Sequence, residues 1–88
     1  MIVKEMTITN QLGLHARASG ALVRLASTFQ SEITVAKDGT RVNAKSIMGL
    51  LLLAAANGSL IEVTAEGDDE QEAVTATENL IRRQFHEE

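Results

Sequence analysis

The stretch EITVAKDGTRVNAK, residues 32–45, decides the fold of this chain of 88 residues. Its two halves, 32–37 and 40–45, are rich in β-branched residues and flank the dipeptide Asp38-Gly39. A two-residue hairpin turn needs positive φ at both of its central positions, and Asp-Gly meets that need. The stretch therefore predicts an antiparallel β-hairpin, around which the other elements are placed.

Two further segments, IVKEMTIT (residues 2–9) and SLIEVTAE (59–66), alternate between apolar and polar residues. The apolar residues that share one side are Ile2, Met6 and Ile8 in the first segment and Ile61, Val63 and Ala65 in the second. Alternation of this kind predicts strands with one buried face. The chain is therefore expected to contribute four strands.

Three segments predict helices. Apolar residues recur at steps of three and four from Ala16 to about Thr28, which is typical of an amphipathic helix. Ser46 is a natural N-cap for a helix over 47–56, and Asn57-Gly58 is a suitable left-handed stop. The buried stripe of that helix is expected at Ile47, Leu50, Leu51 and Ala54.

The last helix follows Gly67. Asp69 and Glu72 there make a plausible capping box. Its apolar face is expected to run through Val74, Thr77, Leu80, Ile81 and Phe85, with Arg82 and Arg83 in its last turn. The element order is then β-α-β-β-α-β-α, which predicts an α+β open-faced β-sandwich over a single domain, 1–88. Its four-stranded sheet is mainly antiparallel with helices on one face, and the pairing of the outer strands stays open.

Composition excludes several classes of function. The chain has no Cys, and its longest apolar run, 47–56, is too short to cross a bilayer. The N-terminus lacks the pattern of a signal peptide, so a soluble cytoplasmic protein is expected. Phe29 and Phe85 are the only aromatic residues, which disfavours a nucleic-acid surface.

Nothing in the sequence predicts a metal or hydrolytic site. There is no carboxylate pair, His cluster or glycine-rich nucleotide loop. We interpret Glu70, Glu72 and Glu78 as a solvated helix face, and His86 as part of a frayed helix end.

Charge is unevenly distributed along the chain, whose net charge is −4. Residues 1–60 hold six basic and three acidic residues, a balance of +3, whereas residues 61–88 hold two basic and nine acidic residues, a balance of −7. This division suits phosphate groups or acidic partners near the N-terminal half.

The segment GLHARASG, residues 13–20, places His15 where a helix begins. If His15 is the N-cap, the unpaired N–H groups of Ala16, Arg17 and Ala18 and the positive end of the helix dipole form an anion site. Arg17 adds a cation with forked donors. Neutral imidazole is nucleophilic, so His15 could be phosphorylated transiently, although a histidine in such a loop is more often a plain surface residue.

GLHARAS (13–19) and VNAKSIMGL (42–50) together resemble the two characteristic motifs of the HPr family. These are the histidine-containing phosphocarriers of the bacterial phosphoenolpyruvate:sugar phosphotransferase system. The resemblance covers essentially the whole chain. It implies that Nδ1 of His15 takes a phosphoryl group from phosphorylated Enzyme I and passes it to enzyme IIA components, with Arg17 assisting. It also implies that no cofactor is bound, since phosphoenolpyruvate and Mg²⁺ act through Enzyme I.

One residue departs from the family's motif. The family usually has Pro after the His-Ala-Arg triplet, where this chain has Ala18. Proline is tolerated in a first helical turn because its missing N–H needs no partner there. Ala18 restores that donor, so we expect it to affect the lifetime of a phosphohistidine at His15.

Ser46 has two interpretations. As an N-cap it would stabilise its helix by about 1 kcal/mol relative to Ala. KSIMG also resembles the regulatory site of those family members that are phosphorylated by the ATP-dependent HPr kinase/phosphorylase. A phosphate there would be favoured by the helix dipole and would weaken docking to Enzyme I by charge repulsion.

The helix over 47–56 is apolar all round, and one short helix on a sheet cannot bury every side. The exposed residues could be covered by a loop or could form a docking surface for partners. For the second case we expect contacts from Ile47, Met48, Leu51 and Leu52, with Arg24 and Lys45 as a charged rim.

Three functions stay open at this point. The chain could be a phosphocarrier, a regulatory or nitrogen-branch homologue that acts by binding partners, or a small anion-binding α+β module. His15 argues against a purely regulatory form. A monomer is expected by default.

Overall fold

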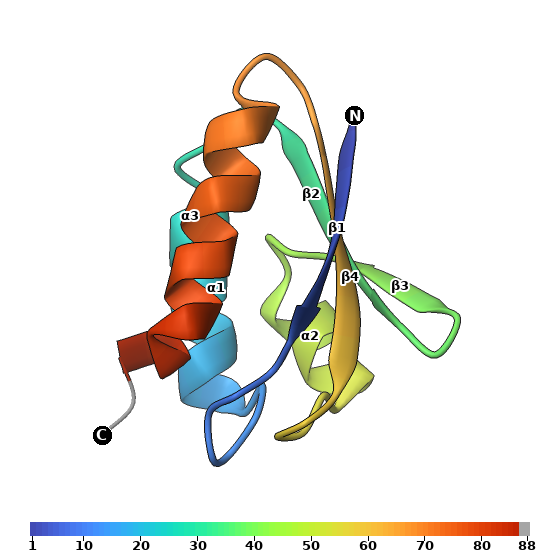
Figure 1. The fold of residues 1–88 in the computed structure, drawn as a ribbon, viewed down its shortest axis with the longest axis vertical. Coiled ribbons are helices and arrows are strands. Elements are labelled where there is room, and N and C mark those ends of the chain that lie inside the picture. The colour runs from blue at the N-terminus through green and yellow to red at the C-terminus, as the bar shows by residue number, and fades with distance from the viewer. Residues whose placement is uncertain (87–88) are drawn as a thin grey trace.

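The computed structural model describes residues 1–86 as a four-stranded sheet with three helices (Figure 1). The elements are β1 (Ile2–Thr7), α1 (Ala16–Ala26), β2 (Glu32–Lys37), β3 (Thr40–Asn43), α2 (Ile47–Leu53), β4 (Leu60–Glu66), α3 (Glu70–Arg82) and a short turn of helix η1 (Gln84–His86). The strands lie in the order β1-β4-β2-β3. All three pairings are antiparallel, so the predicted α+β class and element order are confirmed.

The hairpin forms as predicted. Asp38 and Gly39 have φ values of 50° and 84°, and Lys37 pairs with Thr40 on either side of them. The second strand of the hairpin is shorter than predicted and ends at Asn43. Beyond it the chain turns, because the Asn43 carbonyl accepts the Ser46 N–H at 3.0 Å and the Asn43 side chain accepts the Lys45 N–H at 2.8 Å.

The pairing that the sequence left open concerns β4. It lies between β1 and β2, although it is the last strand in the chain. α1 and α3 run side by side on one face of the sheet, as Figure 1 shows. The largest fully buried apolar side chains come from the sheet, the β1–α1 loop and the first two helices: Ile8, Leu22, Ile33, Val35, Leu50, Ile61 and Val63.

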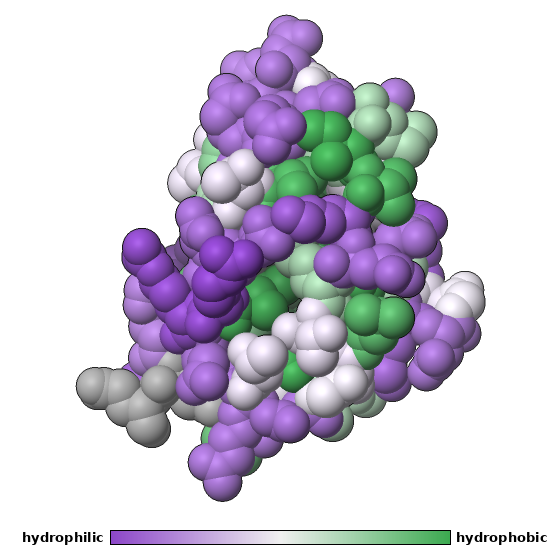
Figure 2. All heavy atoms as spheres, viewed as in Figure 1, coloured by the Kyte–Doolittle hydropathy of each residue, from purple (hydrophilic) through white to green (hydrophobic). Residues whose placement is uncertain are grey.

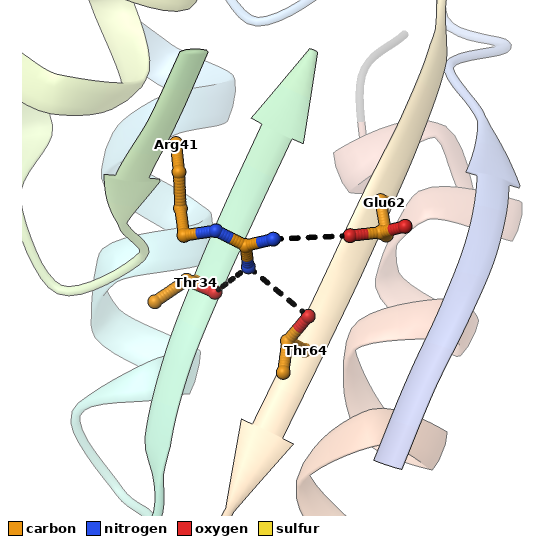
Figure 3. A network of polar contacts seen from close by, with 4 residues as sticks. All are labelled: Thr34, Arg41, Glu62 and Thr64. Atoms are coloured by element: carbon orange, nitrogen blue, oxygen red, sulfur yellow. Dashed lines mark hydrogen bonds and ion pairs between the residues drawn. The ribbon is translucent and has the colours of Figure 1, made fainter. Parts of the chain in front are cut away.

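The other face of the sheet carries a polar network centred on Arg41 of β3 (Figure 3). The Arg41 guanidinium donates to the hydroxyls of Thr34 at 2.9 Å and Thr64 at 3.2 Å, and contacts Glu62 at 3.1 Å. Thr34 and Thr64 are paired across β2 and β4, so one side chain spans three strands. Glu62 lies opposite Glu5 of β1, and the positive charge of Arg41 offsets the repulsion between these two carboxylates.

The predicted end of the second helix is wrong. α2 ends at Leu53, and Ala54 takes the left-handed conformation, with φ 51° and ψ 40°. The buried residues of α2 are Leu50 and Leu53, whereas Ile47 and Leu51 of the predicted stripe are exposed. Ala54 turns the chain so that Ala55 is buried. The prediction of a regular helix over 47–56 did not include this turn.

The last helix also departs from its prediction at both ends. Asp69 precedes α3 but makes no side-chain capping bond to it. Its carboxylate instead accepts the N–H groups of Gln30 and Ser31, both at 2.9 Å, and the Ser31 hydroxyl. These bonds tie the start of α3 to the α1–β2 loop, and they hold the pKa of Asp69 below its usual range. The predicted capping box with Glu72 is therefore absent.

At its C-terminal end α3 stops at Arg82, with Arg83 as its cap. Gln84, Phe85 and His86 all have positive φ, between 57° and 59°. Phe85 is buried as predicted, but it reaches the core from this left-handed turn and not from a helix. His86 is exposed there, and the rest of the predicted frayed tail, 87–88, lies outside the described residues.

Two of the three carboxylates predicted to be solvated are paired. Glu78 contacts Lys4 of β1 at 2.8 Å and Arg82 at 3.5 Å, and the Lys4 hydrogen bond lowers its pKa. Glu70 accepts the Gly67 N–H at 3.1 Å. Figure 2 shows the side of the molecule that carries α3, where hydrophilic residues cover most of the surface. Within residues 1–86, no helix has the length and apolar character needed to span a membrane.

Candidate functional site

His15 caps the N-terminus of α1, as the sequence predicts. Its backbone is extended (φ −75°, ψ −179°), and its ring Nδ1 accepts the Arg17 N–H at 3.2 Å. Its carbonyl accepts the Ser19 N–H at 2.8 Å, which begins the helical hydrogen bonding. In a neutral ring, an accepting Nδ1 places the proton on Nε2. The nitrogen with a lone pair is therefore the one that faces the helix N-terminus.

The environment of His15 favours an anion. α1 has no acidic residue in its first turn, so the positive end of its dipole is not compensated from within the helix. His15 is half-buried, while Ala16 and Arg17 are exposed. Ala18 is only 1% exposed, which contradicts the prediction that its N–H points toward solvent. The first-turn donors on exposed residues are thus those of Ala16 and Arg17, of which the Arg17 N–H donates to His15 Nδ1.

The loop before His15 is held close to the segment that follows α2. Gly13 has φ +67°, and a Cβ there would lie 2.8 Å from Ala56 Cα, so only glycine fits. Leu14 donates its N–H to the Ala55 carbonyl at 2.8 Å and accepts the buried Ser19 hydroxyl at 3.1 Å. Both polar groups of the residue before His15 are therefore fixed.

Two asparagines outside the predicted site hold the same loop. Asn10 is fully buried, and its Nδ2 donates to the Gly13 carbonyl at 2.7 Å. Asn57 Nδ2 donates to the carbonyls of Thr9 and Asn10, both at 3.1 Å. The sequence predicts only a helix stop at Asn57, and no signal in it indicates partners 47 and 48 positions away.

Ser46 caps α2 as predicted. Its Oγ accepts the Gly49 N–H at 3.1 Å, and the residue is half-buried. α2 has seven residues, so it is about 10 Å long. Ser46 lies at the start of α2, whereas the loop before His15 contacts Ala55, just beyond the end of α2. His15 and Ser46 therefore lie near opposite ends of this short helix.

The outer side of α2 is uncovered among the described residues. Ile47, Met48, Leu51 and Leu52 are 45%, 69%, 37% and 76% exposed, which favours the docking-surface interpretation over a covering loop. Leu12, in the loop before His15, is 66% exposed and was not selected from the sequence. We call these five residues the apolar patch.

The two predicted rim cations differ. Arg24 is exposed, and its Nη1 would lie 3.5 Å from a Cβ at Gly20, so its side chain extends along α1 toward the helix N-terminus. Lys45 is half-buried, and its Nζ donates to the Phe29 carbonyl at 2.9 Å. Lys45 therefore links the α1–β2 loop to the start of α2 in addition to any role at the rim. Within residues 1–86, no group of three or more His, Cys, Asp or Glu side chains could hold a metal ion.

Comparison with known proteins agrees with this geometry. Residues 2–83 match the family described as PTS HPr component phosphorylation site. The chain is 49% identical to the phosphocarrier protein HPr of Xylella fastidiosa, over 100% of this chain and 99% of that protein. It is 45% identical to the HPr-like protein Crh of Halalkalibacterium halodurans, over 96% of this chain and 100% of that protein.

The fold matches as closely. The crystal structure of HPr-C-His from Thermoanaerobacter tengcongensis superposes with a TM-score of 0.96 at 46% identity, covering 100% of this chain and 99% of that one. This chain belongs to the HPr family of the phosphotransferase system. Members of that family are phosphocarriers and not enzymes, and a general role in phosphoryl transfer follows for this chain.

Proposed function

We propose that His15 accepts a phosphoryl group from phosphorylated Enzyme I and passes it to enzyme IIA components. The observation that carries this proposal is the position of His15 Nδ1, which lies against the first turn of α1 and accepts the Arg17 N–H at 3.2 Å. A phosphoryl group attached to Nδ1 would carry its negative charge close to the first turn of α1, where backbone N–H groups and the helix dipole favour an anion.

The transfer step requires Nδ1 to exchange one partner for another. The Nδ1 lone pair turns from the Arg17 N–H toward the incoming phosphorus and forms a new P–N bond. The bond between phosphorus and the donor breaks at the same time, and the donor leaves with that electron pair. The Arg17 N–H is then available to a phosphoryl oxygen, and Nε2 keeps its proton. Onward transfer to enzyme IIA is the same step in reverse.

The donors around the phosphoryl group must hold it only loosely, because strong stabilisation of the phosphorylated carrier would slow onward transfer. Ala16 and Arg17 are exposed residues, so their N–H groups suit this role, with the Arg17 side chain as the cation. The Ala18 N–H is covered, so we assign it at most an indirect part. No cofactor is needed at this site, since phosphoenolpyruvate and Mg²⁺ would act through Enzyme I.

The test mixes the protein with Enzyme I, Mg²⁺ and phosphoenolpyruvate. We expect one added phosphate, which is acid-labile because a P–N bond is a phosphoramidate, and which is lost in His15→Ala. Ser46→Ala is the matched control and should be phosphorylated like the wild type. An acid-stable adduct, or an adduct that persists in His15→Ala, would contradict the proposal.

For Ser46 we propose regulatory phosphorylation by an HPr kinase/phosphorylase. Two observations support it: the Oγ lies at the start of α2, where the dipole favours a phosphate, and it accepts the Gly49 N–H at 3.1 Å. Incubation with that kinase and ATP should label the wild type and not Ser46→Ala. A wild type that takes up no label would remove this part of the proposal.

The apolar patch is our candidate docking surface for Enzyme I, enzyme IIA and the kinase, with Arg24 and Lys45 at its edge. Exposed apolar area of this kind next to a transfer site is typical of protein contact surfaces. We further propose a cytoplasmic monomer without nucleic-acid or membrane partners.

A second function is favoured by the similarity to Crh. In a regulatory or nitrogen-branch homologue, partner binding through the Ser46 region would matter more than phosphate flow. The Enzyme I assay separates the two, because a regulatory protein would bind partners without an acid-labile phosphate. A plain anion-binding module would take up no phosphate, either from phosphorylated Enzyme I or from the kinase with ATP.

A further inference from the structure

Two segments far apart in the sequence are hydrogen-bonded to each other over the residues that precede His15. Ile8 donates its N–H to the Ser59 carbonyl at 2.9 Å, and its carbonyl accepts the Gly58 N–H at 2.8 Å. Leu14 then donates to Ala55 at 2.8 Å. Residues 9–13 lie between these two points, and the backbone hydrogen bonding to the 54–59 segment is interrupted over them.

Asn57 fills that interruption. Its side-chain amide donates to two successive carbonyls, those of Thr9 and Asn10, each at 3.1 Å. The Asn10 carbonyl also accepts the Gly13 N–H at 3.2 Å, which closes the turn that leads to Leu14 and His15. The Asn57 side chain therefore bonds to the same oxygen that defines this turn.

We infer that Asn57 is a positioning residue for phosphoryl transfer at His15, an inference that rests on the proposed function. The path from Asn57 to the ring is short and consists of named bonds: through the Asn10 carbonyl to Gly13, and from there to Leu14, whose N–H and carbonyl are both held. His15 is the next residue, and its orientation follows from that of Leu14.

Orientation matters here because two different partners have to present phosphorus in line with the same nitrogen. A displacement of about 1 Å in a reacting group can cost up to about 100-fold in rate. Loss of the Asn57 bonds would loosen residues 9–13, and the Nδ1 lone pair would sample directions away from the Arg17 N–H. The expected effect is therefore on transfer, beyond any effect on stability.

The test compares Asn57→Asp with Asn79→Asp. Aspartate keeps the size of the side chain but removes both N–H donors and places a negative charge against two carbonyls. Asn79 is an exposed asparagine on α3, so the same change there controls for the added charge. Thr77→Ala, which deletes a buried hydroxyl bonded to Ala73 at 2.8 Å, controls for a loss of stability away from the site.

Three quantities are measured for each variant: the rate of phosphorylation by phosphorylated Enzyme I, the amide proton shift of Arg17, and the free energy of unfolding. We expect Asn57→Asp to slow phosphorylation about tenfold or more, and to move the Arg17 amide resonance as its bond to His15 Nδ1 loosens. Asn79→Asp and Thr77→Ala should stay within about twofold of the wild type.

The outcomes are distinguishable. If Asn57→Asp loses stability but keeps both the wild-type rate and the wild-type Arg17 resonance, Asn57 has a structural role only and the inference is wrong. If Thr77→Ala slows transfer as much as Asn57→Asp, the effect belongs to stability, which also overturns it. A wild type that takes no phosphate from Enzyme I contradicts the proposed function itself.

Discussion

α1 and α2 begin in the same way with different side chains. His15 Nδ1 accepts the N–H of Arg17, and Ser46 Oγ accepts the N–H of Gly49, each at slightly more than 3 Å. Neither helix has an acidic residue in its first turn. In both places a side-chain acceptor that we propose as a phosphorylation site therefore lies against backbone donors of the first turn and the positive end of a helix dipole.

The difference between the two caps lies in their chemistry and their neighbours. Imidazole is nucleophilic in its neutral form, whereas a serine hydroxyl needs a base to activate it. Arg17 adds a cation at the first cap, and exposed Ile47 and Met48 follow the second. If both proposed phosphorylations occur, one local structure, an N-cap, holds a labile phosphate at one helix and a stable one at another.

The largest expected effect distinguishes the role of Ser46 as the N-cap of α2 from its proposed role as a regulatory phosphorylation site. Ser46→Asp should slow phosphorylation of His15 by Enzyme I about tenfold, because the new charge repels an acidic partner face. Ser46→Ala should leave that rate unchanged but lower the free energy of unfolding by about 1 kcal/mol, because the cap of α2 is lost. Transfer kinetics and urea denaturation of both variants measure this.

Equal transfer rates for Ser46→Asp and Ser46→Ala would mean that a negative charge at residue 46 does not weaken docking of the partner. An unchanged stability in Ser46→Ala would mean that α2 does not depend on its cap. Either result would break the parallel between the two helices.

A second pair of substitutions tests the bodies of the helices. Ala54→Gly should stabilise the protein by about 1 kcal/mol, because a left-handed alanine is strained by its Cβ. Gly20→Ala, the reverse change, should also stabilise by about 1 kcal/mol in α1, since its Cβ meets only Arg24 Nη1 at 3.5 Å. Thermal and urea unfolding measure both changes.

Opposite signs for these two substitutions would contradict this account of α1 and α2. The double variant should show additive effects, because the two positions lie in different helices. A large deviation from additivity would indicate coupling between the two helices.

A smaller effect is expected at the departure from the family's motif. Ala18→Pro removes an N–H from the first turn of α1, where proline is tolerated. We expect the lifetime of phosphorylated His15 to shorten by no more than about fivefold, because Ala18 is covered and one net hydrogen bond contributes only about 1 kcal/mol. Hydrolysis of the purified phosphoprotein measures it. Identical lifetimes would exclude any role for the Ala18 N–H.

The smallest effect concerns the third helix, whose start is not capped by its own Asp69. Hydrogen bonds from the Ser31 hydroxyl and the Gln30 N–H lower the pKa of Asp69, so its contribution to stability is present above the ordinary pKa of about 4. That contribution is lost as the pH falls through the lower folded-state pKa. The stability difference between wild type and Asp69→Asn should therefore shrink from pH 6 toward pH 2.5. Exposed Asp68→Asn is the control, and a difference that does not change with pH would contradict the assignment.

Much of the fold and of the site could be predicted from short segments. Asp38-Gly39 forms the hairpin turn, and His15 and Ser46 cap their helices as predicted. Each of these features depends on a few consecutive residues, whose backbone preferences and side-chain acceptors act locally. The burial of Phe85 was also predicted, although the left-handed turn that delivers it was not.

The features that the sequence did not predict depend on residues distant in the chain. Asp69 has the right type and place to cap α3, yet Gln30 and Ser31 compete for its carboxylate and bind it. Asn57 was interpreted as a helix stop because the 54–59 segment gives no sign of the loop that packs on it. Ala18 was expected to expose its N–H, but packing of the first turn covers it.

The sequence by itself determined that the chain has four strands and three helices, that His15 and Ser46 stand at helix starts, and that the chain resembles one family. Only the tertiary structure decided that β4 lies between β1 and β2, that α2 stops at Ala54, and that Asn57 holds the loop of His15. Local preferences are carried by neighbouring residues. Strand order, the end of a packed helix and the partners of a polar side chain depend on which distant segment buries or bonds it.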